Sequence, residues 1–339
     1  MSRSDCEEVG SERVAIVRAE GDVMDHRTVT FKVVGTCQIQ ADVYTVPTDA
    51  ARPAIVWIHG GALISGGRQN IHSGQLDLYV RAGYAVISID YRLAPETKLP
   101  AIIEDVQDAF RWVREEGPEL FGIDPHRLAV IGHSAGGYLT LMAGFCVDPR
   151  PRALVAFCGY GDIAGAWYSR PDPFYSQQPA VSRAEAEAAV GGEILSNASG
   201  PEHRQRGRFY LYCRQQGLWP GEVTGHDPDA EPRAFDPFCP QRHVTREYPP
   251  TLLLHGNRDT DVPYEQSVVM ARELAGAAVK HQLLTVPGGG HGFDSGMEAP
   301  MVARAFEVVL AFLERHTGPL EQPLSSSPST STQRHGYHP

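Results

Sequence analysis

Ser134 has the surroundings of a catalytic nucleophile. It lies in Gly-His-Ser-Ala-Gly-Gly at residues 132–137, which fits G-x-S-x-G, between an apolar run at 128–131 and a helical run at 138–145. A serine hydroxyl is a weak nucleophile and must meet a base and a substrate carbonyl together. A sharp strand-to-helix turn presents it in this way and requires small neighbours. The segment predicts catalysis by Ser134, and the alternative is an ordinary strand–helix turn.

A second glycine-rich turn follows the apolar run at residues 54–58. It reads His-Gly-Gly-Ala at positions 59–62. A tetrahedral acyl-transfer intermediate carries a negative oxygen that needs preorganised N–H donors, and glycine allows the backbone to come close to it. We expect the N–H groups of Gly61, Ala62 and Ala135 to form this oxyanion hole. His59 is expected to brace the loop through hydrogen bonds.

The base is predicted to be His291. It lies in a glycine-rich loop, Pro-Gly-Gly-Gly-His-Gly-Phe at residues 287–293, directly after the apolar run at 282–286. A loop of this kind can carry an imidazole over the serine. His255 and His133 are the alternatives among the other histidines.

The carboxylate that orients the base is predicted in His-Gly-Asn-Arg-Asp-Thr-Asp-Val-Pro, residues 255–263. Asp259 is the preferred residue, with Asp261 as the alternative. An aspartate in a loop before Val-Pro more often caps a turn or a helix, and this interpretation suits Asp261.

These residues must be positioned by alternating strands and helices. Residues 29–34 and 38–46 predict a hairpin, and helical spacing follows Pro100 and recurs over residues 302–312. Short apolar runs, expected of strands covered on both faces, occur at residues 54–58, 84–89, 128–131, 154–157, 251–254 and 282–286. The alternation predicts an α/β fold, with a mainly parallel central sheet and helices on both faces.

The domain prediction has four parts. Residues 1–28 form an N-terminal segment, and residues 29–162 with 246–316 form the core. Residues 163–245 lack strong strand runs and are too long for a simple connection, so we expect a cap or lid insertion there. Residues 317–339 are rich in Ser, Thr and Pro, and we expect a disordered tail.

The aromatic side chains of the predicted insertion have two interpretations. They could supply an acyl pocket, or they could form the core of the insertion itself. They are Trp167, Tyr168, Phe174, Tyr175, Phe209, Tyr210, Tyr212 and Trp219.

Composition excludes several classes of partner. The net charge of −11 and the absence of a basic cluster argue against nucleic acid. No apolar run has the length of a membrane span, and the N-terminus lacks the apolar region of a signal peptide. The six cysteines show neither CxxC nor metal-ligand spacing. We therefore expect a cytoplasmic protein without a metal site or a membrane span.

Taken together, these segments resemble the hormone-sensitive-lipase-like branch of the α/β-hydrolase esterases, over roughly residues 30–316. The matching motifs are HGGA (59–62), DYRLAPE (90–96) with Pro100, GHSAGG (132–137), HGNRDTDVP (255–263) and GGGHGF (288–293). The order Ser134, Asp259, His291 is the one this fold uses. The resemblance implies a carboxylesterase for small acyl esters that needs no cofactor, and it leaves a homodimer open. Asp90, Arg92 and Glu96 are expected to hold a loop by pairing with one another.

Two features depart from the pattern of that branch. Its oxyanion motif usually has a third glycine where this chain has Ala62, and the segment before His59 is short for a helical N-terminal cap. Both favour small esterases that deacetylate sugars or cleave feruloyl esters. A serine exopeptidase or amidase using the same triad is the alternative enzyme, and a hydrolase-like ligand-binding protein is the non-enzymatic alternative.

Overall fold

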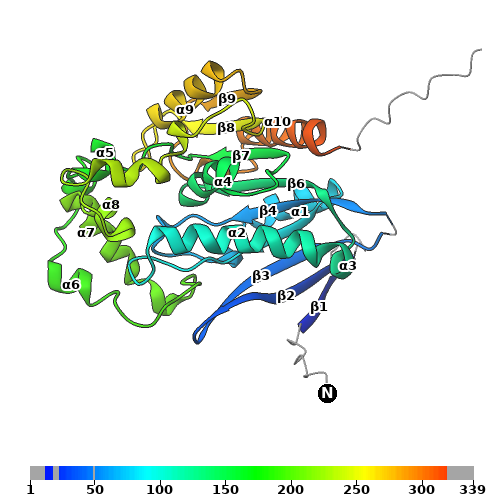
Figure 1. Cartoon of the computed structure of the whole chain (residues 1–339), viewed down its shortest axis with the longest axis horizontal. Helices are drawn as coiled ribbons and strands as arrows, with labels where there is room; N and C mark the ends of the chain where they lie inside the picture. Colours follow the sequence, from blue (N-terminus) through cyan, green and yellow to red (C-terminus); the bar gives the residue numbers. More distant parts are fainter. Residues whose placement is uncertain (1–11, 18–22, 49, 319–339) are drawn as a thin grey trace, which may run out of the picture.

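The computed structural model describes residues 12–17, 23–48 and 50–318, which are built around one nine-stranded sheet (Figure 1). Its strand order is β1-β2-β3-β5-β4-β6-β7-β8-β9. The strands are β1 Glu12–Val17, β2 Val23–Val34, β3 Cys37–Thr45, β4 Arg52–Ile58, β5 Ala85–Ile89, β6 Ile123–His133, β7 Ala153–Phe157, β8 Thr251–Gly256 and β9 His281–Val286.

The pairing of neighbouring strands changes once across the sheet, from antiparallel to parallel. The pairs β1–β2, β2–β3 and β3–β5 are antiparallel. β4 pairs parallel with both β5 and β6, and the parallel pairing continues through β7, β8 and β9. Parallel strands end at the same edge, so the loops after β4, β6, β8 and β9 can meet there. The predicted fold class, a mainly parallel sheet flanked by helices, is confirmed.

Helices cover both faces of the sheet, which explains the continuous apolar runs. In β4, Ala54, Val56 and Ile58 enter one buried cluster, while Ile55 and Trp57 enter the other. The first cluster includes residues of α2 (Leu99–Glu115), α3 (Gly117–Phe121), α4 (Ala135–Cys146) and α9 (Glu265–Gly276). The second includes residues of α1 (Ser73–Arg81) and α10 (Pro300–Thr317). A strand between two such layers has no polar face.

The segment between β7 and β8 is helical and contains no named strand. Its α-helices lie beyond one end of the sheet in Figure 1. They are α5 Ala166–Ser169, α6 Arg183–Glu187, α7 Arg206–Gln216 and α8 Trp219–Thr224. This segment corresponds to residues 163–245, the proposed cap.

The sheet begins earlier in the chain than the sequence indicated. β1 and the first part of β2 lie within residues 1–28, for which no strand was predicted. Residues 25–28 of β2 are only partly buried, so they lack the apolar run that marks a central strand. In the described part of the chain, no helix has both the length and the apolar character needed to cross a bilayer. The predicted tail lies outside the described residues, except for its first two.

Candidate active site

Ser134 lies at a strained turn between β6 and α4. Its backbone has φ 56° and ψ −118°, and its N–H donates to the carbonyl oxygen of Phe157 at 2.8 Å. A non-glycine residue with positive φ is uncommon, and such strain persists only where neighbouring contacts enforce it. This conformation is the one expected of a nucleophile elbow.

The glycines around Ser134 allow this turn to pack closely. A Cβ atom on Gly132 would lie 2.2 Å from the carbonyl oxygen of Gly136. A Cβ on Gly136 would lie 2.0 Å from the carbonyl oxygen of Ile58, at the end of β4. Both contacts are with backbone, which cannot move aside as a flexible side chain could. The G-x-S-x-G pattern is therefore required by the packing of β6 and α4 against β4.

Asp259 and His291 form a directly bonded pair. Nδ1 of His291 lies 2.8 Å from Oδ2 of Asp259. The other carboxylate oxygen, Oδ1, accepts from the N–H groups of Asp261 at 2.9 Å and Val262 at 3.0 Å. Burial opposes the charge of Asp259, but hydrogen bonds from His255 and His291 hold its pKa well below its usual range. Asp259 is therefore an ionised, fixed acceptor, as an orienting carboxylate must be.

The surroundings of His291 raise the pKa of its imidazole. Burial lowers its pKa, but the hydrogen bond with Asp259 and the charges of Asp261, Asp259 and Asp294 outweigh that effect and raise the pKa above its ordinary value. A raised pKa increases the basicity of the imidazole, which suits a general base.

His255 and His133, the two alternatives to His291, contact the Asp259–His291 pair. His255 is fully buried, with Nδ1 at 2.7 Å from Oγ of Ser267 and Nε2 at 3.2 Å from Oδ2 of Asp259. Nε2 of His133 lies 2.8 Å from the carbonyl oxygen of His291. The structure thus places His255 behind Asp259 and His133 against the backbone of His291.

The structure brings His291 to the nucleophile turn without a hydrogen bond to the serine. The rings of His133, next to Ser134, and His291 have centroids 4.9 Å apart. Among the described contacts, none joins the Ser134 hydroxyl to His291, and Nε2 of His291 lies 3.4 Å from Oδ2 of Asp261. Catalytic hydrogen bonds are often long in unliganded enzymes and shorten when substrate binds.

The loop after β4 lies against Ser134. A Cβ atom on Gly60 would come within 3.4 Å of the Cβ of Ser134. Gly61 has φ 106°, and a Cβ there would lie 2.1 Å from the carbonyl oxygen of Ser65, so only glycine fits. Ala62 also has positive φ, at 56°. Within the described residues, neither the Gly61 nor the Ala62 N–H donates to another group, which leaves both free for an oxyanion.

Two side chains fix this loop in place. Nδ1–H of His59 donates to the carbonyl oxygen of Gly60 at 2.7 Å, and the ring stacks on Tyr91 at 4.1 Å. Burial lowers the pKa of His59 to about 4, so the ring is neutral. Nε1–H of Trp219, in α8, donates to the carbonyl oxygen of Ala62 at 2.8 Å. His59 therefore braces the loop as predicted, whereas no sequence pattern indicated the contact from Trp219.

The acidic and basic residues of DYRLAPE have partners elsewhere, so the expected mutual pairing is wrong. Asp90 pairs with Arg68 at 2.6 Å, Arg92 with Asp105 at 2.7 Å, and Glu96 with Arg206 at 2.7 Å. All three are held by side chains distant in the sequence, which local spacing could not indicate. The Glu96–Arg206 pair joins this loop to α7 in the proposed cap.

Asp261 connects the proposed cap to His291. Its Oδ1 accepts from Arg214 at 2.6 Å and from the Tyr210 hydroxyl at 2.5 Å, both in α7. Arg214 is 1% exposed and also pairs with Asp172 at 2.6 Å. The remaining oxygen of Asp261 is the one near Nε2 of His291. Asp261, the alternative to Asp259 in the sequence analysis, therefore lies next to Nε2 of the His291 ring, whereas Asp259 lies next to Nδ1.

Most aromatic residues of the proposed cap pack on one another. Tyr168 stacks between Trp167 at 4.0 Å and Trp219 at 3.9 Å. Tyr168, Phe209 and Trp219 are buried, whereas Phe174 is exposed. For these three buried residues, the packing favours the interpretation that they form the core of the proposed cap.

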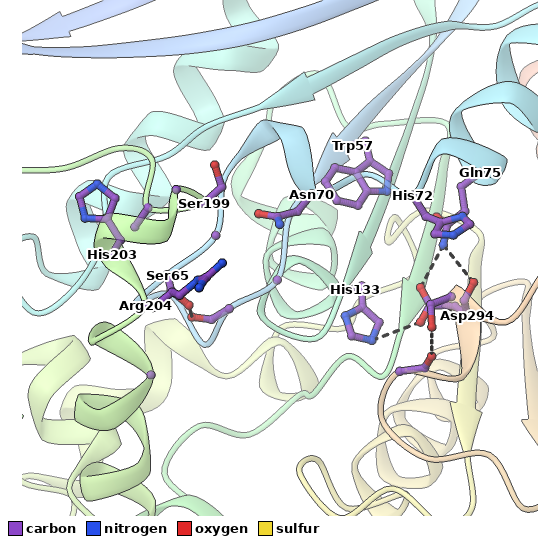
Figure 2. Close-up of a pocket in the computed structure, with 18 residues that line it drawn as sticks. Trp57, Ser65, Asn70, His72, Gln75, His133, Ser199, His203, Arg204 and Asp294 are labelled. Atoms are coloured by element: carbon purple, nitrogen blue, oxygen red, sulfur yellow. Dashed lines mark hydrogen bonds and ion pairs between the residues drawn. The ribbon is translucent and has the colours of Figure 1, made fainter.

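A cavity of about 550 Å³ opens beside the loop after β4. Figure 2 shows side chains from three parts of the chain around it. Its lining includes Gly60 and Gly61, His133 next to the serine, and Gly292 next to the base. The cavity therefore adjoins the candidate catalytic residues, and the sequence did not predict it.

Two groups of side chains in this region have the spacing of metal ligands. They are His133, Cys158 and His291, and Cys158, His255 and Asp259. Burial raises the pKa of the Cys158 thiol well above its usual range, so it is protonated and a poor ligand. The imidazoles and the carboxylate are engaged with one another as described above. The hydrogen bonds among these side chains and the protonated thiol therefore do not favour a metal site here.

The amino-acid sequence is similar to a known family model and to known enzymes. Residues 55–295 match a family model described as alpha/beta hydrolase fold. The chain is 31% identical to Esterase LipC of Mycobacterium tuberculosis over 252 residues, covering 74% of this chain and 55% of LipC. It is 26% identical over 318 residues to the non-reducing polyketide synthase adrD of Penicillium rubens, covering 80% of this chain but 13% of the synthase.

Solved structures share the architecture. An alpha/beta hydrolase superfamily protein from Enterococcus faecalis aligns with TM-score 0.66 and 23% identity, over 84% of this chain and 97% of that one. The esterase of Pyrobaculum calidifontis aligns with TM-score 0.60 and 24% identity, over 90% and 85%. At these identities the likeness supports the fold alone.

Proposed function

Because residues 55–295 match its family model, this protein belongs to the α/β-hydrolase fold family, and we propose that it is a serine carboxylesterase acting on small acyl esters. The observation that carries the proposal is the bonded pair of Asp259 and His291 beside the strained turn at Ser134. The relationship to Esterase LipC supports it.

The first half of the reaction forms an acyl-enzyme. Nε2 of His291 takes the proton of the Ser134 hydroxyl while Oγ attacks the ester carbonyl carbon. Asp259 keeps the proton on Nδ1 and stabilises the imidazolium. The N–H groups of Gly61, Ala62 and Ala135 hold the negative oxygen of the intermediate. His291 then gives its proton to the alcohol oxygen, and the C–O bond to the alcohol breaks.

The second half hydrolyses the acyl group. His291 takes a proton from water, whose oxygen attacks the acyl carbon on Ser134. The same N–H groups stabilise the second tetrahedral intermediate. His291 returns the proton to Oγ as the carboxylic acid leaves, so the enzyme ends as it began. Each step uses residues that lie on the loops after β4, β6, β8 and β9.

The test is hydrolysis of p-nitrophenyl acetate and butyrate by the purified protein. Ser134→Ala is expected to lower kcat by several orders of magnitude, because the nucleophile is lost. Ser176→Ala is the matched control, since that residue is exposed and lies in the proposed cap. A fluorophosphonate probe should label the protein and the control variant but not Ser134→Ala. Equal hydrolysis by Ser134→Ala would refute the mechanism.

The proposal extends to location and assembly. All described cysteines, at positions 37, 146, 158, 213 and 239, are free thiols, which favours the cytoplasm. Within the described residues β9 pairs with β8 only, so its other edge offers a surface for a homodimer. Light scattering at micromolar concentration tests the dimer, and a monomer mass would rule it out.

A further inference from the structure

The loop that carries His291 gains little from the packing of its neighbours. His291 lies between Gly290 and Gly292, and a Cβ atom on either glycine would meet no atom beyond its chain neighbours within 4 Å. Glycine loses more conformational freedom on folding than any other residue, so such a loop is costly to fix in one position. A general base must nevertheless stay within hydrogen-bond reach of the proton that it takes. The position of His291 therefore depends on the hydrogen bonds that hold it.

Two side chains donate to the main-chain carbonyl oxygen of His291. Nε2 of His133 lies 2.8 Å from this oxygen, and Sγ of Cys158 lies 3.6 Å from it. A carbonyl oxygen only accepts, so Nε2 of His133 carries a proton and donates it to the bond. His133 directly precedes Ser134, and Cys158 directly follows β7. The main chain of the base is thus attached to the turn that holds the nucleophile, whereas its ring is attached to Asp259.

The His133 ring has its own partners on two sides. Nε2 also lies 3.5 Å from Oδ1 of Asp294, whose Oδ2 accepts from Nε2–H of Gln75, in α1, at 3.0 Å. Both residues are buried, and Figure 2 shows Asp294 joined to Gln75 and to His133. On the other side, a Cβ atom on Gly60 would lie 3.4 Å from Nδ1 of His133, so the loop after β4 borders the ring. The carboxylate at Nε2 favours the tautomer that has its proton on this nitrogen.

The attachment at the carbonyl matters because Asp261 attracts the His291 ring from its other side. The carboxylate of Asp261 lies 3.4 Å from Nε2 of His291, and Arg214 of the proposed cap holds that carboxylate at 2.6 Å. A ring held only at Nδ1, by Asp259, could pivot about that bond toward Asp261. With the main chain also held at its carbonyl, fewer positions of Nε2 remain.

We infer that His133 is a positioning residue: by holding the carbonyl of His291, it keeps the imidazole of the base within reach of Ser134. Asp294 and Gln75 orient the His133 ring for this bond. The inference rests on the proposed function, because it assigns a role in the transfer of the Ser134 proton to His291. In this role His133 acts through the base, so its loss should slow the chemical steps more than it weakens binding. A displacement of about 1 Å in a catalytic group can cost about 10²-fold in rate.

The test measures kcat and KM for hydrolysis of p-nitrophenyl acetate by the full-length chain. His133→Leu removes the donor but still fills space, and we expect kcat to fall by about 10–10²-fold while KM changes by less than about threefold. His133→Gln keeps an N–H group at about the distance of Nε2 from the main chain. It should therefore restore kcat to within about threefold of the unsubstituted protein. The rate at which a fluorophosphonate labels Ser134 should follow the same order.

His243→Leu is the matched control for His133→Leu. Nε2 of His243 lies 2.7 Å from the carbonyl oxygen of Asp236, so the substitution removes the same kind of hydrogen bond, but within the proposed cap. It should leave kcat, KM and the labelling rate unchanged. The melting temperature of each variant is measured as well, and assays run well below the lowest midpoint separate a loss of positioning from a loss of folded protein.

Asp294→Asn tests the same attachment without changing His133. It keeps an oxygen to accept from Gln75 but removes the charge that faces Nε2 of His133, so we expect kcat to fall by about three- to fivefold. In the His133→Leu background it should have no further effect, because residues that act through one contact are not additive. Burial lowers the pKa of His291, and the charge of Asp294 is among those that raise it. The rates are therefore compared above the acid limb of the pH profile, where that imidazole is neutral.

Failure of this inference is distinguishable from failure of the proposed function. If Ser134→Ala is inactive but His133→Leu keeps full kcat, the positioning role is wrong and the esterase proposal stands. Equal losses in His133→Leu and His133→Gln, or an undiminished effect of Asp294→Asn in the His133→Leu background, would also overturn it. Should His133→Leu not fold, unchanged kcat in Asp294→Asn overturns it instead. If the unsubstituted protein neither hydrolyses the ester nor reacts with the fluorophosphonate, both proposals are wrong.

Discussion

Asp261 lies on the opposite side of the His291 ring from Asp259. Oδ2 of Asp261 is 3.4 Å from Nε2 of His291, and Oδ2 of Asp259 is 2.8 Å from Nδ1. The imidazole therefore has a carboxylate at each nitrogen. In the proposed mechanism Nε2 faces Ser134, so Asp261 competes with the serine for this nitrogen in the unliganded protein.

The first prediction concerns the pH dependence of kcat/KM. The charge of Asp261 helps to raise the pKa of His291, and the reaction needs a neutral imidazole, so activity should fall as pH drops through this raised pKa. Asp261→Asn removes the negative charge, which lowers the pKa and should move the acid limb of the profile to lower pH. Asp229→Asn, at an exposed aspartate paired with Arg170, is the control. An acid limb that stays in place or moves upward would contradict the assignment.

The second prediction separates the two aspartates by their effect on turnover. Asp259→Asn should lower kcat for p-nitrophenyl acetate by about 10⁴-fold with little change in KM, because the imidazole loses the partner that sets its tautomer. Asp261→Asn should lower kcat far less at a pH above the acid limb. Similar losses in both variants would assign the orienting role to the pair instead of Asp259 alone.

The sequence predicted the central strands because they are buried on both faces. Residues 54–58 and 154–157 are unbroken apolar runs, and the structure gives β4 at Arg52–Ile58 and β7 at Ala153–Phe157. The edge of the sheet was missed for the opposite reason. Residues 25–28 of β2 are partly exposed and polar, so neither an apolar run nor a turn signal marks them.

Site residues were predictable where a local motif constrains the backbone, and unpredictable where the partner is distant. Ser134 and Gly61 are marked by glycines that the packing requires. The contacts of Ala62 with Trp219 and of Asp261 with Arg214 join residues far apart in the chain, across a segment without a regular pattern. The same limit explains why DYRLAPE suggested internal pairing although its charges have external partners.

The third prediction tests the attachment of the proposed cap through Arg214. Arg214→Met keeps much of the side-chain volume but leaves the charges of Asp172 and Asp261 without their buried partner. Removing one member of a buried ion pair typically costs about 3–5 kcal/mol, so we expect a loss of that size in the free energy of unfolding. Urea denaturation measures it. Arg170→Met, at an exposed arginine of the same segment, should have little effect, and equal stability of the two variants would argue against the cap attachment.

The fourth prediction tests whether Trp219 positions the oxyanion loop. Trp219→Phe keeps an aromatic ring for stacking on Tyr168 but removes the Nε1–H that donates to the carbonyl oxygen of Ala62. The freed loop should hold its N–H groups less accurately. We expect kcat to fall by roughly tenfold, less than the about 10²–10³-fold loss on deleting an oxyanion donor outright, while KM stays nearly constant.

A matched tryptophan distinguishes positioning from a general loss of stability. Nε1–H of Trp112, in α2, donates to the Glu116 carboxylate at 3.2 Å, away from the catalytic loops. Trp112→Phe therefore removes a comparable hydrogen bond without touching Ala62, and it should lower the melting temperature but not kcat. If Trp219→Phe lowers stability alone, the bond to Ala62 is only structural. If kcat falls in that variant and not in Trp112→Phe, α8 of the proposed cap holds the loop that stabilises the oxyanion.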